Sequence, residues 1–337
     1  PGSLFPTFFG GGFESSTHRR ADGRRLDLIE ATAHDRWAEA DYRALAALGL
    51  GWARDGLRWH RIERAPGRYD FDGFRPRLRA ARDAGVTVAW DLCHYGWPDG
   101  LDIWSPAFPR RLAGFARAAA EVVRAETDAA PIWCPVNEMS FWSWAGGDAA
   151  YLNPHARGRG FELKVQLARA ALAAADAVRD VDRRARLLWA EPVIHVAADP
   201  ERPGDAAEAE GHRQAQFQAW DLIAGRLWPQ IGGTEETLDL VGVNYYARNQ
   251  WVHGGPHLAE GHPLYRPLRA ILAEVAARYG RPLVVAETSV EGDARPGWLR
   301  MIGREVAAAR AGGAPVEGVC WYPVLDYPGW DDDRPCP

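Results

Sequence analysis

Eight short apolar runs alternate with longer amphipathic stretches from one end of the chain to the other, and this alternation limits the fold more than any other feature. The runs are rich in β-branched and aromatic residues and are separated by Gly and Pro, so each predicts a strand. Strands that alternate with helices favour a parallel sheet, and eight of them favour a closed (β/α)8 barrel of the α/β class. The predicted strands are residues 7–13, 51–60, 85–94, 131–138, 186–195, 239–246, 282–287 and 316–323.

The stretches between these runs have helical periodicity. In residues 160–180, for example, Leu163, Leu167 and Ala171 fall on one face. An open doubly wound sheet is the alternative, but no GxGxxG motif follows an early strand. We therefore expect residues 1–337 to form a single barrel domain whose last helix is missing or truncated, because the chain ends soon after the eighth run. The predicted helices are 34–48, 73–84, 109–125, 160–180, 206–227, 264–279 and 296–311.

The composition argues against several classes of protein. The 337 residues carry a net charge of -5 and scattered arginines, so we expect no nucleic-acid partner. No apolar run is long enough for a membrane span and no leader pattern is visible, so we expect no membrane partner and a cytoplasmic location. The four cysteines form no CxxC motif, and the histidines form neither HxH nor HExxH, so no metal or other cofactor is expected. The oligomeric state stays open.

Polar residues end most of the apolar runs. In a barrel of this type, the carboxyl ends of the strands carry the chemistry, and the intervals between these residues are each long enough for one helix and one strand. We therefore expect their side chains to meet at one rim of the barrel, which we define as the carboxyl ends of its strands. The residues are Arg54, His94, Glu138, Glu191, Tyr246, Glu287 and Trp321.

Two of these residues, Glu138 and Glu287, suit the cleavage of a glycosidic bond. One carboxyl group can protonate the departing oxygen, while the other attacks the anomeric carbon or activates water. A single glutamate at a strand end can equally belong to a structural ion pair. The recurrence of such residues at regular intervals favours a catalytic site.

Seven segments resemble, in the same order, the motifs of glycoside hydrolase family 1, the β-glucosidase-like retaining enzymes. The segment "RDGLRWHRI" matches the family's R-x-x-x-x-W-x-R-I run without a gap. The segments "FFGGGFESST", "HYGWP", "VNE", "VGVNYY", "VVAETS" and "WYPVLDYPGW" resemble the motifs of its other strands. The resemblance implies a (β/α)8 fold and a retaining β-glycosidase that works through a covalent glycosyl-enzyme intermediate on a small glycoside or oligosaccharide.

The resemblance also implies roles for the residues at the active centre. Glu138 would be the general acid and base, and Glu287 the nucleophile, with carboxyl groups about 5–5.5 Å apart. Arg54 and Tyr246 would hold the nucleophile ionised, and Asn137 would bind the sugar 2-hydroxyl.

Further residues follow from the same motifs. Asn244 shares a strand face with Tyr246 and would support catalysis. His94 would bind a sugar hydroxyl, and Trp321 would form an aromatic floor under the sugar ring. His18 and Trp330 lie in the two segments that bind the outer hydroxyls in the family, and we expect both to bind substrate.

Those two segments also depart from the family pattern. The Gln expected near residues 15–18 is absent, and Gly329 stands where a Glu is expected. Simple β-glucosides should therefore be poor substrates, because unmatched hydroxyl groups weaken binding. A sugar-binding protein without hydrolytic activity, or a transglycosylating accessory domain, is the alternative function. Retention of both glutamates favours the enzyme.

Overall fold

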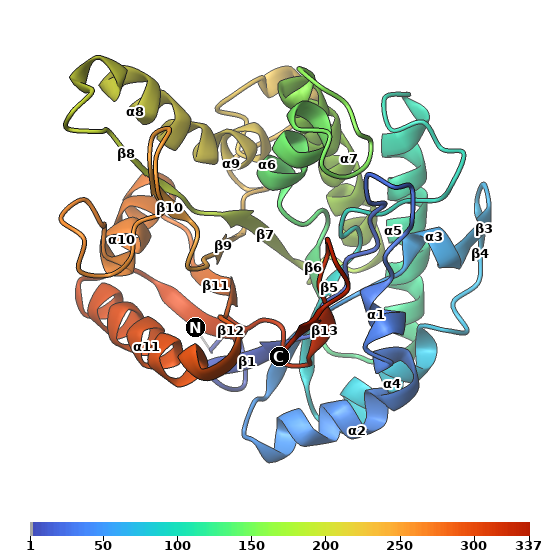
Figure 1. Ribbon diagram of the computed structural model, residues 1–337. Coiled ribbons are helices and arrows are strands. Elements are labelled where there is room, and N and C mark those ends of the chain that lie inside the picture. The colour runs from blue at the N-terminus through green and yellow to red at the C-terminus, as the bar shows by residue number, and fades with distance from the viewer. Residues whose placement is uncertain (1–2) are drawn as a thin grey trace.

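The computed structural model describes residues 3–337, which contain a closed barrel of eight parallel strands (Figure 1). The strands follow one another around the barrel in chain order, and β1 closes the ring by pairing with both β2 and β12. Each predicted run contains one barrel strand, so the predicted fold class is confirmed. The strands are β1 (Phe9–Gly12), β2 (Trp52–Gly56), β5 (Thr87–Asp91), β6 (Ile132–Cys134), β7 (Arg186–Pro192), β9 (Leu240–Asn244), β11 (Leu283–Thr288) and β12 (Val316–Trp321).

Helices surround the barrel, as the sequence periodicity predicts (Figure 1). The predicted helix 206–227 is divided in two by a 3₁₀ turn, η3 (Ala215–Phe217). The helix predicted from residue 264 begins only after Pro267, which is consistent with the preference of Pro for the start of a helix. The outer helices are α2 (His34–Ala47), α4 (Arg75–Asp83), α5 (Ala107–Glu126), α7 (Gly160–Val181), α8 (Ala206–Gln214), α9 (Gln218–Ile223), α10 (Leu268–Tyr279) and α11 (Arg295–Ala311).

No helix follows β12 within residues 3–337, as expected. An antiparallel hairpin of β13 (Tyr327–Pro328) and β14 (Pro335–Cys336) takes its place and lies beside the short helix α1 (Leu28–Ala31) (Figure 1). Other short elements lie in the loops. They are α3 (Trp59–Ile62), β3 (Glu63–Ala65), β4 (Arg68–Tyr69), α6 (Met139–Trp142), the π-helix η1 (Ser143–Asp148), β8 (His195–Ala197), the 3₁₀ turns η2 (Pro203–Asp205), η4 (Pro229–Ile231) and η5 (Gly292–Ala294), and β10 (Gln250–Val252).

Because side chains alternate along a strand, those of β2 point in turn into the barrel interior and toward the helix layer. Trp52 belongs to the interior cluster and stacks on Phe5, with ring centroids 3.9 Å apart and planes 11° apart, so the two rings fill the amino-terminal end of the barrel. Arg54, two residues later, points into the same interior toward the rim. The barrel is thus closed at one end by packed rings and carries its polar side chains at the other.

Asp55 points the opposite way, toward the helices. It accepts hydrogen bonds from Arg77 of α4 at 2.6 Å and Tyr42 of α2 at 2.9 Å, and its Oδ2 lies 3.1 Å from His34 Nε2. Burial alone would raise the pKa of Asp55, but Arg77 and His34 lower it well below its ordinary value. This buried carboxylate therefore ties two helices to the strand that carries Arg54.

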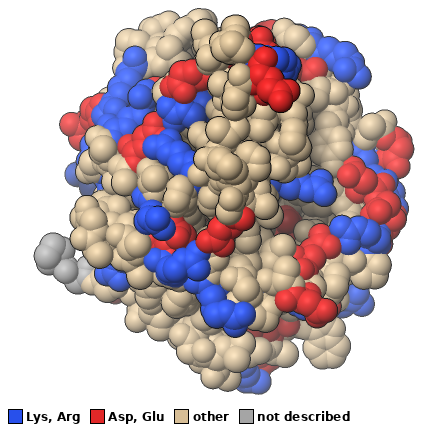
Figure 2. Space-filling model, turned by 60° about the vertical axis from the view of Figure 1, so that its left-hand side comes forward, with Lys and Arg blue, Asp and Glu red and all other residues tan. Residues whose placement is uncertain are grey.

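The surface has no single electrostatic character on the face seen in Figure 2, where acidic and basic side chains are interspersed. No helix within residues 3–337 has both the length and the apolar character that crossing a lipid bilayer requires.

We predict that replacing Gly10 by Ala destabilises the barrel. A Cβ at this position would lie 2.4 Å from the Trp52 ring, which stacking on Phe5 prevents from moving aside. Overpacking of this kind costs about 1–3 kcal/mol, measurable as a lower free energy of unfolding in urea. The control is Gly303→Ala in α11, where a Cβ meets nothing within 4 Å and the helix should gain up to about 1 kcal/mol. Equal stability of the Gly10 variant and the wild type would show that the barrel floor is loosely packed.

Candidate active site

Glu138 lies four residues after the end of β6 and immediately before α6, with a backbone φ of 46° that turns the chain at the rim. Its side chain is buried. Glu191 of β7 holds the start of α6, since its carboxylate accepts hydrogen bonds from the backbone N–H groups of Met139 at 2.7 Å and Ser140 at 2.9 Å. Burial raises the pKa of Glu191 to about 7. Glu191, one of the residues predicted to lie at the rim, therefore holds the segment that positions Glu138.

Glu287 lies near the end of β11, after a register shift that places it opposite Asn244 of β9. Arg54 Nη1 donates a hydrogen bond to Oε1 at 2.7 Å, and the Tyr246 hydroxyl donates one to Oε2 at 2.7 Å. These are the two contacts that the family resemblance implies. Both oxygens of the Glu287 carboxylate are thus held by donors from other strands.

The Arg54 guanidinium is fully buried and connects several strand ends. Its Nη2 donates to Asp91 at 2.6 Å and to Asn137 Oδ1 at 3.0 Å. Because a guanidinium only donates, the Asn137 atom that faces it must be the oxygen. The Asn137 amide nitrogen therefore faces His94 Nε2 at 3.1 Å and the Tyr95 hydroxyl at 3.1 Å.

This orientation determines the tautomer of His94. Its Nε2 accepts from Asn137, so the ring proton lies on Nδ1, which is 2.9 Å from Asp91 Oδ2. Burial lowers the pKa of His94, whereas Asp91 and Glu14 raise it and produce a net increase. Protonation of Nε2 would nevertheless set two donors against each other at Asn137, so the hydrogen-bond network favours the neutral ring.

Glu138 has a different environment from Glu287. Asn244 Nδ2 donates to its Oε1 at 2.9 Å, and the Tyr95 hydroxyl donates to its Oε2, but no cation within residues 3–337 pairs with it. Burial raises the pKa of Glu138 to about 8, and the negative charge of Glu287 adds to this increase. Glu138 therefore holds a proton at neutral pH while lying within the electrostatic influence of Glu287.

His18 and Trp330 meet over this site, with ring centroids 4.4 Å apart. Trp330 also lies 5.8 Å from Tyr95. His18 Nδ1 is 2.6 Å from Ser16 Oγ, and burial lowers the pKa of His18 to about 3, so its ring is neutral. Both residues border a hollow of about 350 Å³ that also includes Tyr151 and Asp331. The structure thus brings the predicted pair together beside Tyr95, whose hydroxyl contacts Glu138.

Tyr322, rather than Trp321, occupies the place next to His94. Cys320 points into the barrel, so alternation along the strand turns Trp321 away from the interior. The Tyr322 ring lies parallel to His94, with centroids 6.2 Å apart, and fits only because Gly12 has no side chain, since a Cβ there would be 2.1 Å from it. Trp321 makes none of the contacts described above, so its predicted role as an aromatic floor stays a prediction.

Three other site residues were not among the predicted ones. Asp91 ends β5, Glu14 follows soon after β1, and Tyr95 comes directly after His94 with a backbone φ of 65°. A polar residue at the end of an apolar run was a usable signal for Asp91 and Glu14. Nothing local indicates the left-handed turn that directs the Tyr95 hydroxyl back to Glu138.

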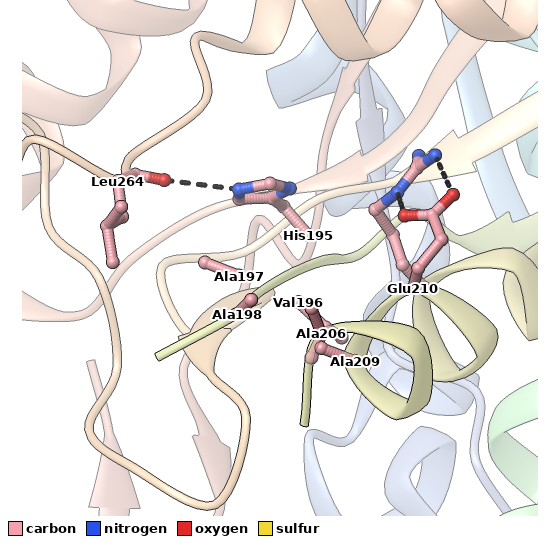
Figure 3. A pocket seen from close by; sticks show the side chains of 9 residues that line it. His195, Val196, Ala197, Ala198, Ala206, Ala209, Glu210 and Leu264 are labelled. Atoms are coloured by element: carbon pink, nitrogen blue, oxygen red, sulfur yellow. Dashed lines mark hydrogen bonds and ion pairs between the residues drawn. The ribbon is translucent and has the colours of Figure 1, made fainter. Parts of the chain in front are cut away.

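A second hollow, of about 360 Å³, lies outside the barrel between β8, α8 and the loop that carries Leu264 (Figure 3). His195 Nε2 lies 3.1 Å from the Leu264 carbonyl oxygen, and Glu210 pairs with Arg213 at 2.8 Å. Its polar groups therefore largely satisfy one another. Within residues 3–337, no group of three or more His, Cys, Asp or Glu side chains is arranged to hold a metal ion.

Fold and site together define a (β/α)8 barrel with two differently paired glutamates at its rim. Among solved structures, the chain is similar to a family 1 β-glucosidase from Thermotoga maritima, at 16% identity and a TM-score of 0.77 over 99% of this chain and 92% of that one. A complex of the Thermotoga maritima β-glucosidase with deoxynojirimycin gives a TM-score of 0.79 at 16% identity, over 98% and 92% of the two chains.

The AHE enzyme from Alicyclobacillus herbarius is similar to the same degree, with a TM-score of 0.77 at 16% identity over 99% of this chain and 91% of that one. No protein-family model and no curated protein sequence matches the chain. The resemblance to family 1 that the motifs predict is thus confirmed at the level of the fold.

We predict that Glu138→Gln stabilises the fold at alkaline pH. The folded protein holds the Glu138 proton up to about pH 8, whereas the ordinary pKa is 4.5, so the wild type loses stability as the pH rises between these values. Gln carries no charge and avoids this loss. Between about pH 5 and pH 9 the variant should gain about 4 kcal/mol relative to the wild type, measured by urea denaturation. The exposed Glu236→Gln should show no such gain, and a constant difference across this range would contradict the elevated pKa.

Proposed function

We propose that residues 1–337 form one catalytic domain that acts as a retaining β-glycosidase on a small glycoside or oligosaccharide. The observation that carries the proposal is the contrast between the two glutamates. Glu138 has no cationic partner and has a pKa raised to about 8, while Glu287 is paired with Arg54 at 2.7 Å. A proton donor that faces a paired carboxylate is what double displacement at an anomeric carbon requires.

The reaction follows from these two environments. Glu287 attacks the anomeric carbon and forms a glycosyl ester, while Glu138 transfers its proton to the departing oxygen as the glycosidic bond breaks. The carboxylate left on Glu138 then takes a proton from water, and the resulting hydroxide attacks the same carbon. The sugar leaves with its original anomeric configuration, and Glu287 is regenerated as the carboxylate.

Neighbouring side chains orient these steps. Arg54 and Tyr246 leave the Glu287 carboxylate little rotational freedom, and Asn244 holds one oxygen of Glu138. Both N–H bonds of Asn137 are engaged, one with His94 and one with Tyr95. The Asn137 oxygen accepts only from Arg54 Nη2 and has a second lone pair, so a sugar hydroxyl can donate to it without displacing either neighbour.

Binding of a sugar without hydrolysis is the other candidate, but the site disfavours it. A protein that only binds sugar gains nothing from burying an acid whose pKa is raised to about 8. Such burial costs folding free energy at neutral pH and is typical of catalytic positions.

We predict distinct azide products from two variants assayed with an activated aryl β-glycoside. Glu287→Ala should lose at least about 10³-fold in kcat, and azide should restore turnover with an α-glycosyl azide as product, because azide attacks directly. Glu138→Ala should lose about 10²–10⁴-fold in kcat with poor leaving groups, and azide should yield the β-glycosyl azide through the intermediate.

The wild type should lose kcat/KM as the pH rises through about 8, where Glu138 gives up its proton.

Glu236→Ala serves as the control because its side chain is exposed. NMR of the products distinguishes the two anomers. A single azide anomer from both variants would contradict the assigned roles, and unimpaired hydrolysis by Glu287→Ala would contradict the proposed function itself.

We predict that p-nitrophenyl β-glucoside is a poor substrate. The segments that bind the outer hydroxyls in the family differ here, because the Gln expected near residues 15–18 is absent and Gly329 stands where a Glu is expected. Missing hydroxyl partners reduce kcat/KM by several orders of magnitude in sites built for hydrogen bonding. Release of p-nitrophenol measures the rate. A kcat/KM above about 10⁴ M⁻¹s⁻¹, within the ordinary range for enzymes, would contradict this prediction.

A further inference from the structure

A third glutamate, Glu14, lies at the same rim. It is 7% exposed, and its Oε1 accepts hydrogen bonds from the Ser16 backbone at 3.0 Å and the Tyr322 hydroxyl at 3.4 Å. Its Oε2 accepts no hydrogen bond from the described residues. Glu14 Oε1 lies 3.8 Å from His94 Nε2, and the negative charge of Glu287 adds to the raised pKa of Glu14. The carboxyl group of Glu14 therefore belongs to the same polar site as Glu287.

Glu14 lacks a cationic partner within residues 3–337. The nearest candidate is His94, whose Nε2 lies 3.8 Å away, beyond hydrogen-bonding distance, and already accepts from Asn137. Arg54 directs its donors to Glu287, Asp91 and Asn137 instead. A buried carboxylate without a partner is costly, and the burial of Glu14 raises its pKa accordingly.

Two buried acceptors and one buried donor of the site have no hydrogen-bond partner within residues 3–337. The acceptors are Asn244 Oδ1 and Asp91 Oδ1, the donor is Arg54 Nε, and Asn244 is the residue that holds Glu138. An unpaired buried acceptor is costly unless a ligand supplies the donor. The Glu14 carboxylate and the two unpaired acceptors therefore both favour a ligand that is positively charged and rich in hydrogen-bond donors.

We propose that the site binds glycosides whose sugar carries a protonated amino group, held by Glu14, on a ring carbon other than the anomeric one. An ammonium group offers three donors and compensates the charge of Glu14, whereas a hydroxyl group offers one donor and no charge. The hydrolysis itself needs only Glu138 and Glu287, so Glu14 acts as a specificity residue. This inference names a substrate class for the proposed glycosidase and rests on that function.

The test compares matched p-nitrophenyl β-glycosides that differ only by an amino or a hydroxyl group at C3, C4 or C6. For at least one position, the wild type should prefer the amino sugar by at least about tenfold in kcat/KM, as expected for a charge-assisted hydrogen bond. Acetylation of that amine removes the charge and should abolish the preference, without any change to the protein.

The variant Glu14→Gln keeps the shape and removes the charge. It should lose most of the preference, mainly through a higher KM for the amino sugar. The exposed Glu236→Gln should retain the wild-type preference.

Three outcomes would overturn the inference. The first is equal turnover of amino and hydroxyl sugars by the wild type, and the second is a preference that survives acetylation. In both cases the glycosidase function stands. The third is no turnover of any glycoside together with no labelling of Glu287 by a panel of 2-deoxy-2-fluoroglycosyl fluorides, which would overturn the proposed function as well.

Discussion

The buried guanidinium of Arg54 is the interaction on which the rest of the site depends. It lies inside the barrel with no exposure to water and reaches side chains at the ends of β5, β6 and β11. An unpaired charge in this position would be very costly, so carboxylates and an amide oxygen must surround it. The same contacts fix which face Asn137 presents to its neighbours and hold Glu287 in place.

The two glutamates that we propose as acid and nucleophile differ because only one of them is paired with this cation. Glu287 receives a charged donor, whereas Glu138 receives only the neutral donors Asn244 and Tyr95, and the charge of Glu287 raises the pKa of Glu138 further. Burial also favours the protonated form of Glu138. One arginine on one side of the site therefore gives the two glutamates the different environments that the proposed mechanism requires.

The outer part of the site is built differently from its catalytic centre. Aromatic rings cover it, with Trp330 from the carboxy-terminal hairpin packed on His18 and Tyr95. Glu14 adds a carboxyl group that has no cationic partner within residues 3–337. Under the proposed function, catalytic and substrate contacts come from different strands and loops, so specificity can change while the acid and nucleophile stay in place.

The alternation of apolar runs and amphipathic stretches determined the eight strands and the positions of Glu138 and Glu287 at the rim. It also indicated that no helix follows the last strand within residues 3–337. These features could be predicted because strand and helix periods are local properties of a sequence. Only the tertiary structure decided which side chains meet there. A register shift before Glu287, a left-handed turn at Tyr95 and the inward face of Tyr322 rather than Trp321 all depend on packing between distant segments. Such contacts leave no local pattern, because a change of one residue in register turns a side chain to the opposite face of a strand.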